Sequence, residues 1–288
     1  MTKKGNKKIC IGIFIILLIC LCIGSFYDYQ ISSAVFNSNS KIGILLASYG
    51  QLPAMLSLAT GGTLMIRIAD KNKRITFVLA IIGGALLNIL AIMGITMDPL
   101  LYMKSMPWFV SLLIAITLVI IADLFVCQLS NDADKGNMKR LAMLLITAVF
   151  AELILINIVK IPWGRPRMRL IAVNSEAVFQ PWWVIGSTMK EHLTAMGVAA
   201  EEFKSFPSGH SGNAACAILF SVFPLVFPKL KGKGKSFFIG GLIFAILVAV
   251  SRIVMGAHFL SDVTIGISIS FVIIFLLYGY LWRDQIVK

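Results

Sequence analysis

Residues 236–282 read SFFIGGLIFAILVAVSRIVMGAHFLSDVTIGISISFVIIFLLYGYLW. This stretch contains two long apolar runs on either side of a short polar segment. The runs at 236–253 and 262–282 are each about as long as a helix must be to cross a bilayer, roughly 20 residues. Of all 288 residues, 58% are hydrophobic and 14% are charged, and the mean hydropathy is +0.90. Soluble domains carry about 25% charged residues. The two apolar runs and the overall composition together predict an all-α, polytopic helical bundle in a membrane.

Further apolar runs complete the predicted bundle. The eight predicted spans cover 9–25, 48–68, 75–96, 107–129, 141–160, 210–228, 236–253 and 262–282. Gly50, Pro53 and Gly61 interrupt the second span, which is therefore the least regular. The longest connection, 161–209, joins the fifth and sixth spans, and a loop of that length is usually functional. We expect one integral membrane domain over 1–288, with an uncleaved first helix.

The basic residues predict how the bundle sits in the membrane. When the spans are alternated, most of the 26 Lys and Arg fall on the side of the N-terminus, in segments 1–8, 67–74, 135–140, 229–235 and 283–288. Basic residues concentrate on the cytoplasmic side of membrane proteins. We therefore expect a multi-pass protein of the cell membrane with both termini in the cytoplasm. These loops explain the formal charge of +13, so no nucleic-acid partner is expected.

Three short polar clusters stand at predicted span ends on the opposite, extracytoplasmic side. The first is Lys-x6-Arg, the second is Pro-Ser-Gly-His, and the third is Ser-Arg-x5-His-x3-Asp. Their candidate site residues are Lys160, Arg167, Ser208, Gly209, His210, Arg252, His258 and Asp262. Two imidazoles, one carboxylate and three fixed cations are the groups needed to hold a phosphate, attack it and protonate what leaves.

Local spacing predicts how the third cluster is arranged. His258 and Asp262 are four residues apart, which places them on one face of a helix. We expect the Asp262 carboxylate to accept the Nδ1–H of His258, which fixes the tautomer and leaves Nε2 with a free lone pair. Arg252 lies off that face, so we expect a turn at Gly256 to redirect the chain.

The other two clusters contain groups that suit an anion. Ser208 is a predicted helix N-cap, and a helix N-terminus attracts anions through its free N–H groups and its dipole. Gly209 has no side chain, so an oxygen atom can approach the backbone closely. Arg167 and Arg252 can bind phosphate oxygens in bidentate fashion, and Lys160 adds a point charge.

These motifs, in this order, resemble the type 2 phosphatidic acid phosphatase superfamily, which also contains the vanadium haloperoxidases and glucose-6-phosphatase. The resemblance covers about residues 141–282, whereas 1–140 carry no motif. Two features depart from the family pattern. Met168 stands where the family usually has a proline, which leaves the contact of Arg167 and a role for Arg165 open. The family core has six spans, whereas eight are predicted here.

The resemblance implies a phosphohistidine mechanism. His258 would attack phosphorus while Asp262 holds its ring, and His210 would protonate the leaving oxygen and then activate water. The resemblance places Lys160, Arg167, Ser208, Gly209 and Arg252 around the phosphoryl oxygens. It implies no metal and no other cofactor, because fixed cations can supply the electrostatic stabilisation.

The expected activity is hydrolysis of a lipid phosphate or diphosphate, with the lipid tail left in the bilayer. Undecaprenyl diphosphate, phosphatidylglycerophosphate and phosphatidate are the substrates that the resemblance suggests. Two alternatives stay open: a lipid phosphotransferase with the same phosphohistidine, and a non-catalytic transporter. Asp123 and Glu152 lie inside spans and would serve a transporter, or they make polar contacts between helices. Glu201 and Glu202 are expected to be solvated loop charges, and the oligomeric state is left open.

Overall fold

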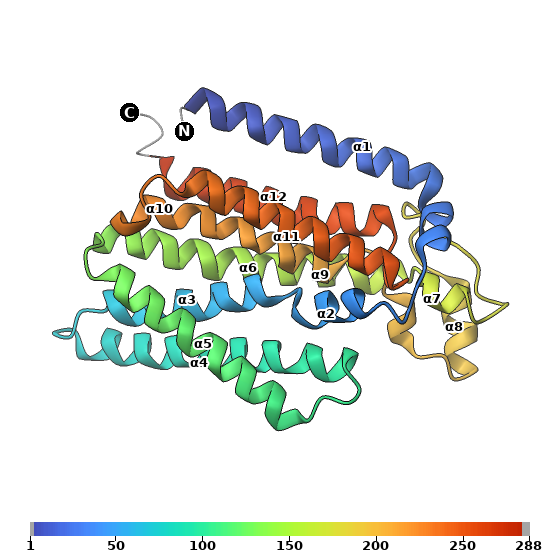
Figure 1. The fold of residues 1–288 in the computed structure, drawn as a ribbon, viewed down its shortest axis with the longest axis horizontal. Coiled ribbons are helices and arrows are strands. Elements are labelled where there is room, and N and C mark those ends of the chain that lie inside the picture. Colours follow the sequence, from blue (N-terminus) through green and yellow to red (C-terminus); the bar gives the residue numbers. More distant parts are fainter. Residues whose placement is uncertain (1–2, 284–288) are drawn as a thin grey trace.

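The fold is built from helices (Figure 1). The computed structural model describes the backbone of residues 3–283 and the side chains of residues 9–283, and within that range the chain forms no strand. The α-helices are α1 (Lys3–Val35), α2 (Lys41–Tyr49), α3 (Leu52–Ile68), α4 (Arg74–Tyr102), α5 (Trp108–Ser130), α6 (Lys135–Trp163), α7 (Met168–Ile171), α8 (Thr188–Ala195), α9 (Gly209–Ala215), α10 (Phe223–Val226), α11 (Gly234–Val254) and α12 (Leu260–Leu281). The 3-10 helices are η1 (Ala200–Phe203), η2 (Cys216–Val222) and η3 (Pro228–Leu230). Lys288, one of the basic residues used to orient the chain, lies outside the described residues.

The eight predicted spans are confirmed as helical segments long and apolar enough to cross a membrane. The first is longer than predicted and covers Ile9–Val35, and the second is made of α2 and α3 in succession over Lys41–Ile68. The break between those two helices falls just before Pro53, where the sequence indicated an interruption. The sixth span, Gly209–Val226, is assembled from α9, η2 and α10. An all-α membrane bundle is therefore confirmed.

The helices are arranged so that α1 and the α4–α5 pair lie on opposite sides of the bundle (Figure 1). Helix α1 packs along α12, and α4 packs against α3 and α5. The short helix α9 lies in the interior, where it contacts α3, α6, α11 and α12. The outward faces are apolar, with Ile16, Leu79 and Leu124 exposed on α1, α4 and α5. Such positions suit contact with lipid tails, which are as apolar as leucine.

The connections are segregated between the two ends of the bundle. The start of α1 and the end of α12 lie at the left in Figure 1, together with the α3–α4, α5–α6 and η3–α11 connections. Helices α7 and α8, which belong to the long connection 161–209, lie at the opposite end. The basic connections and the motif-bearing connection therefore occupy opposite ends, as alternation of eight spans predicts.

Candidate active site

The predicted site residues come from helix ends at the α7–α8 end of the bundle. Lys160 is in the last turn of α6, Arg167 precedes α7, Ser208 to His210 begin α9, Arg252 is in the last turn of α11, His258 lies between α11 and α12, and Asp262 is in the first turn of α12. Residues separated by more than a hundred positions are thereby gathered at one end of the bundle.

Two glycines turn the chain so that these helix ends can converge. Gly164 ends α6 with a φ of 67°, and Gly256 turns the chain after α11 with a φ of 63°. Both values lie in the left-handed region that only glycine enters without steric cost. The turn predicted at Gly256 is confirmed, and its carbonyl also accepts the backbone N–H of Arg169 at 2.9 Å.

The imidazole of His258 is buried and held in one tautomer. Its Nδ1–H donates to the backbone carbonyl of Ser205 at 2.5 Å, and 2% of the residue is exposed. Because Nδ1 carries the proton, Nε2 keeps its lone pair. The expected direct bond to Asp262 is wrong, since Nδ1 lies 3.9 Å from Asp262 Oδ2. His258 precedes the first residue of α12, Leu260, so the rule that places residues four apart on one helix face does not apply to it.

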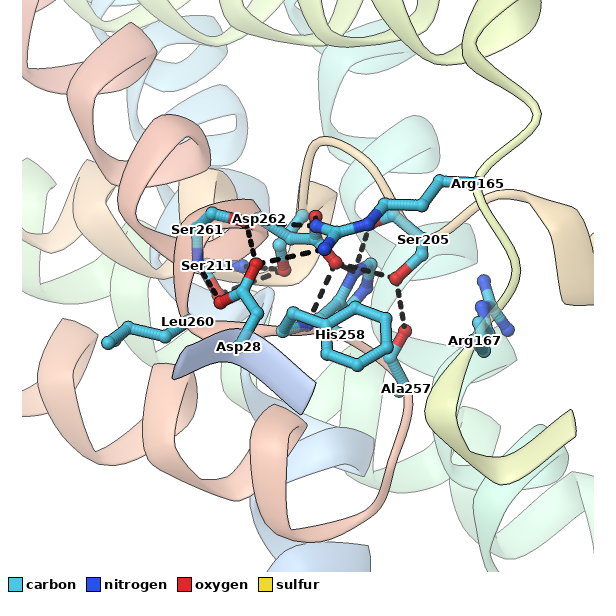
Figure 2. Close-up of polar contacts among 12 residues, drawn as sticks. Asp28, Arg165, Arg167, Ser205, Ser211, Ala257, His258, Leu260, Ser261 and Asp262 are labelled. Atoms are coloured by element: carbon cyan, nitrogen blue, oxygen red, sulfur yellow. Dashed lines mark hydrogen bonds and ion pairs between the residues drawn. The ribbon is translucent and has the colours of Figure 1, made fainter. Parts of the chain in front are cut away.

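Asp262 holds the surroundings of the imidazole instead of the ring itself. Its Oδ2 accepts the hydroxyl of Ser205 at 2.6 Å and the backbone N–H of Phe259 at 2.8 Å. Its Oδ1 accepts Nη1 of Arg165 (Figure 2). Asp262 therefore fixes the residue whose carbonyl fixes His258, and it also satisfies a free backbone donor at the start of α12.

Arg165 is fully buried behind the site and bridges two carboxylates (Figure 2). Besides Asp262, its guanidinium contacts Asp28 of α1 at 2.9 Å and donates through Nε to the carbonyl of Gln180 at 2.8 Å. It also lies 4.3 Å from the ring centroid of Phe259. These contacts join α1, α12 and the long connection through the guanidinium of Arg165, whereas Arg167 stands apart from this cluster in Figure 2.

Arg252 is a buried cation with unused donors. Only 1% of it is exposed, its Nη2 donates to the hydroxyl of Tyr102 at 3.0 Å, and its Nε and Nη1 have no partner among the described residues. A buried N–H without a partner costs free energy, unless an anion binds there. This guanidinium therefore has two buried donors that an anion could accept from.

Arg167 and Lys160 add two further cations. Arg167 donates through Nη2 to Glu201 at 2.8 Å, and its buried Nε has no partner in the described part of the chain. Lys160 Nζ lies close to the start of α9, 3.8 Å from where a Cβ on Gly209 would stand. The absence of a side chain at Gly209 thus keeps open the space between the lysine and the α9 backbone.

Burial and nearby positive charge both favour the neutral form of His258. Burial lowers the pKa of His258 well below its ordinary value, and the positive charges of Lys160, Arg252 and Arg167 lower it further. A neutral imidazole with a free Nε2 is the form that can attack phosphorus. The same three cations that would bind a phosphoryl group therefore also maintain the nucleophilic state of the ring.

His210 lies at the start of α9 beside residues that the sequence did not indicate. Ser208 is the N-cap as predicted, and its hydroxyl accepts the backbone N–H of Ser211 at 3.3 Å. His210 Nε2 lies 3.5 Å from Asp98 Oδ2, and the ring stands edge-on to Tyr102 with centroids 5.7 Å apart. Asp98 and Asp28 lie just outside the predicted spans 75–96 and 9–25, so the sequence did not mark them as carboxylates within a span.

Four acidic residues outside the predicted site differ in their surroundings. Glu201 is exposed, as expected of a solvated charge, and it also pairs with Arg167, whereas Glu202 is partly buried and pairs with Arg169. Asp123 accepts the hydroxyl of Thr63 at 2.6 Å, a polar contact between helices. Glu152 is buried in α6, and neither carboxyl oxygen has a partner among the described residues. Of the two alternatives given for Glu152, the polar contact between helices is therefore not seen among the described residues.

Comparison with known proteins identifies the family. A family model described as the PAP2 superfamily matches residues 141–286. The chain belongs to the PAP2 superfamily. The resemblance drawn from the motifs is therefore confirmed, and the part matched to the PAP2 superfamily includes all the site residues that the motifs predicted. Asp28, Asp98 and Tyr102 lie outside it.

A named relative in the comparison is phosphatidylglycerophosphatase B of Bacillus subtilis (strain 168). It is 41% identical to this chain over 78 residues, which is 26% of this chain and 38% of the relative. The chain thus spans 38% of the length of that relative in the match. No solved structure matches this PAP2 superfamily member.

Proposed function

We propose that this protein is an integral membrane phosphatase that hydrolyses the phosphate or diphosphate group of a lipid. The observation that carries the proposal is the state of His258, a buried neutral imidazole with a free Nε2 among three cations. Membership of the PAP2 superfamily and similarity to a phosphatidylglycerophosphatase support the same class of reaction.

In the first step, Nε2 of His258 attacks the phosphorus atom, and the bond from phosphorus to the leaving oxygen breaks. His210, in its protonated form, donates a proton to that oxygen. Lys160, Arg167 and Arg252 bind the other phosphoryl oxygens through donors that are already in place, so little reorganisation is needed as charge develops. The result is a phosphohistidine and a lipid product with one phosphoryl group fewer.

In the second step, the neutral His210 takes a proton from water while the water oxygen attacks the phosphorus of the phosphohistidine. The nitrogen–phosphorus bond breaks, and its electron pair returns to Nε2 of His258. Inorganic phosphate leaves, and His210 has regained the proton that it needs for the next cycle. Throughout, the Nδ1–H of His258 stays on the Ser205 carbonyl, which offsets the positive charge that the ring carries as phosphohistidine.

The position of the site in the bundle supports a lipid substrate and a site on the extracytoplasmic side. The cations lie at the ends of long apolar helices, so a lipid head group can meet them while its tail stays in the bilayer. Phosphatidylglycerophosphate is the first substrate to test, because the relative's name points to it, followed by undecaprenyl diphosphate and phosphatidate. The basic connections at the opposite end favour an extracytoplasmic site.

The test is phosphate release from these three lipids by purified protein, with and without EDTA. We expect release without an added acceptor, insensitivity to EDTA and inhibition by vanadate, a phosphate mimic. His258→Ala should lower turnover by at least about a thousandfold, because covalent catalysis is lost. His192→Ala is the matched control, since that imidazole is exposed and pairs with Glu176.

Equal turnover by the wild type and His258→Ala would remove the nucleophile from the proposal. Release only when a lipid acceptor is added would identify a phosphotransferase, and no phosphate transfer with any lipid would favour the transporter. Loss of activity in EDTA that magnesium restores would contradict the metal-independent mechanism.

A further inference from the structure

Helix α4 belongs to the part of the chain that carries no motif, yet it reaches the site. Asp98 lies one turn before its end, and 7% of the residue is exposed. Its Oδ2 faces Nε2 of His210 at 3.5 Å, and that nitrogen has no hydrogen-bond partner among the described residues. The carboxylate therefore lies where it can determine how the His210 ring is oriented.

The Asp98 carboxylate is itself held by a short chain of amides. Gln51, between α2 and α3, donates through Nε2 to Asp98 Oδ2 at 2.6 Å. The Oε1 of Gln51 accepts Nδ2 of Asn213. Asn213 lies on α9 three residues after His210. Gln51 and Asp98 therefore link two positions of α9, because Gln51 contacts Asn213 and Asp98 faces His210. A carboxylate fixed in this way can orient an imidazole.

Tyr102 extends the same contact by one turn of α4. Its ring stands edge-on to His210, and its hydroxyl accepts Nη2 of Arg252 at 3.0 Å. One face of α4 therefore meets both the candidate acid and a candidate phosphate ligand. Asp98 and Tyr102, which make these contacts from α4, lie outside residues 141–286, the part that the family model matches.

A carboxylate beside His210 can stabilise the protonated ring that the proposed reaction requires. Arg252, which contacts the same Tyr102 as His210, and Lys160, which lies close to Gly209, are two cations near His210, and nearby positive charge disfavours a protonated imidazole. The proposed first step requires that form, because His210 must donate a proton. Asp98 on Nε2 opposes the two cations and leaves Nδ1 as the nitrogen that can face the leaving oxygen.

We propose that Asp98 is a positioning residue for His210, which holds the ring through Nε2 and supports its protonated form, with Gln51 fixing the carboxylate. This inference rests on the proposed function, in which His210 is the acid and base. It makes the N-terminal helices α3 and α4 a working part of the site.

The experiment compares two leaving groups. Proton donation matters most for a poor leaving group, such as the alkoxide of a lipid phosphate, and least for p-nitrophenolate. We expect Asp98→Asn to lower kcat for lipid phosphate by about tenfold or more, with KM changed little. The loss with p-nitrophenyl phosphate should be much smaller, and the pH profile of kcat should shift for the lipid substrate.

Gln51→Leu is the second variant, because it leaves Asp98 in place and frees its carboxylate. It should show the same dependence on the leaving group with a smaller loss. Asp123→Asn is the matched control, since it changes another intramembrane aspartate that pairs with Thr63, and it should match the wild type with both substrates.

Equal losses with both leaving groups, in Asp98→Asn or in Gln51→Leu, would overturn the inference, as would wild-type rates for Asp98→Asn. If the proposed function itself is wrong, the result is distinguishable, because His258→Ala would then retain turnover. If His258→Ala is inactive while Asp98→Asn loses equally on both substrates, only the role of Asp98 is refuted.

Discussion

The Nδ1 proton of His258 is accepted by a backbone carbonyl, whereas carboxylates hold the residues around it. The Ser205 carbonyl receives Nδ1–H, and Asp262 holds the hydroxyl of Ser205 and the backbone of Phe259. A carbonyl has no charge to lose or proton to take up, so it fixes the tautomer across a wide pH range. Asp262 acts on His258 indirectly, because it holds Ser205, and the Ser205 carbonyl orients the ring.

Burial of His258 predicts how stability depends on pH. Its pKa is lowered well below the ordinary value, first by burial and then by the charges of Lys160, Arg252 and Arg167. In the unfolded chain a histidine titrates near 6.5. As the pH falls below about 6.5, the unfolded chain takes up a proton that the folded protein does not. Stability should therefore fall, by up to about 1.4 kcal/mol per pH unit for this group.

The measurement is the thermal midpoint between about pH 7.5 and about pH 5, the window in which the unfolded histidine titrates. The wild type should lose stability more steeply than His258→Gln, which has no imidazole to protonate on unfolding. His192→Gln is the control substitution, because that side chain is exposed. Parallel slopes for the wild type and His258→Gln would contradict a buried neutral ring.

At the scale of elements, α9 takes its position from α12. Gly266 of α12 approaches the backbone of Ser208, such that an added Cβ would stand 2.3 Å from the Ser208 carbonyl oxygen and 3.2 Å from its carbon. Ser270, one turn later, donates its hydroxyl to the carbonyl of Gly212 at 2.9 Å. Since Ser208 caps α9 and His210 follows it, this contact places the candidate acid.

Gly266→Ala should therefore impair both stability and activity. The methyl group meets backbone that cannot rotate away, so we expect a loss of about 1–3 kcal/mol and a lower kcat from displaced His210. Gly279→Ala is the control in the same helix, because a Cβ there meets nothing within 4 Å. It should leave activity unchanged and raise stability by up to about 1 kcal/mol. Equal effects of the two substitutions on the thermal midpoint would refute the close α9–α12 contact.

The elements were largely predictable because their causes are local. A long apolar run and the Ser208 cap depend on neighbouring residues, and both predictions hold. The contact of Asp262 was predicted wrongly for an equally local reason. The spacing of four residues implies a shared face only inside a helix, and no pattern in the sequence shows that α12 begins at Leu260, after His258.

For the whole molecule, the segregation of charge predicts the orientation of the bundle. The basic connections lie at the end opposite to α7 and α8 (Figure 1). In a cysteine-free background, Val173→Cys should react with a membrane-impermeant maleimide on intact cells, because 82% of Val173 is exposed in the long connection. Lys231→Cys, exposed in the basic connection before α11, should react only after permeabilisation. The reverse pattern would place the site in the cytoplasm.

Contacts across the whole molecule are what the sequence could not predict. Asp28 and Arg165 are 137 residues apart, and Tyr102 and Arg252 are 150 residues apart. Asp28 and Tyr102 are single polar residues at the ends of apolar segments, without a partner nearby in sequence. Their role is decided by how α1 and α4 pack against the motif-bearing helices, which depends on the complete bundle. Residues 1–140 therefore carry no recognisable motif, because their contribution lies in contacts with the motif-bearing helices.

The bond between Asp28 and Arg165 limits how far this protein can be trimmed. A fragment restricted to residues 141–286 would retain every signature motif and still lack one of two carboxylates that neutralise a fully buried guanidinium. The loss leaves Arg165 Nη2 and the backbone N–H and hydroxyl of Ser261 without the carboxylate to which they donate, and each buried donor left unpaired typically costs about 1–3 kcal/mol. The first helix therefore stabilises the candidate active site, and we expect a fragment that contains only the motifs to be less stable than the whole chain.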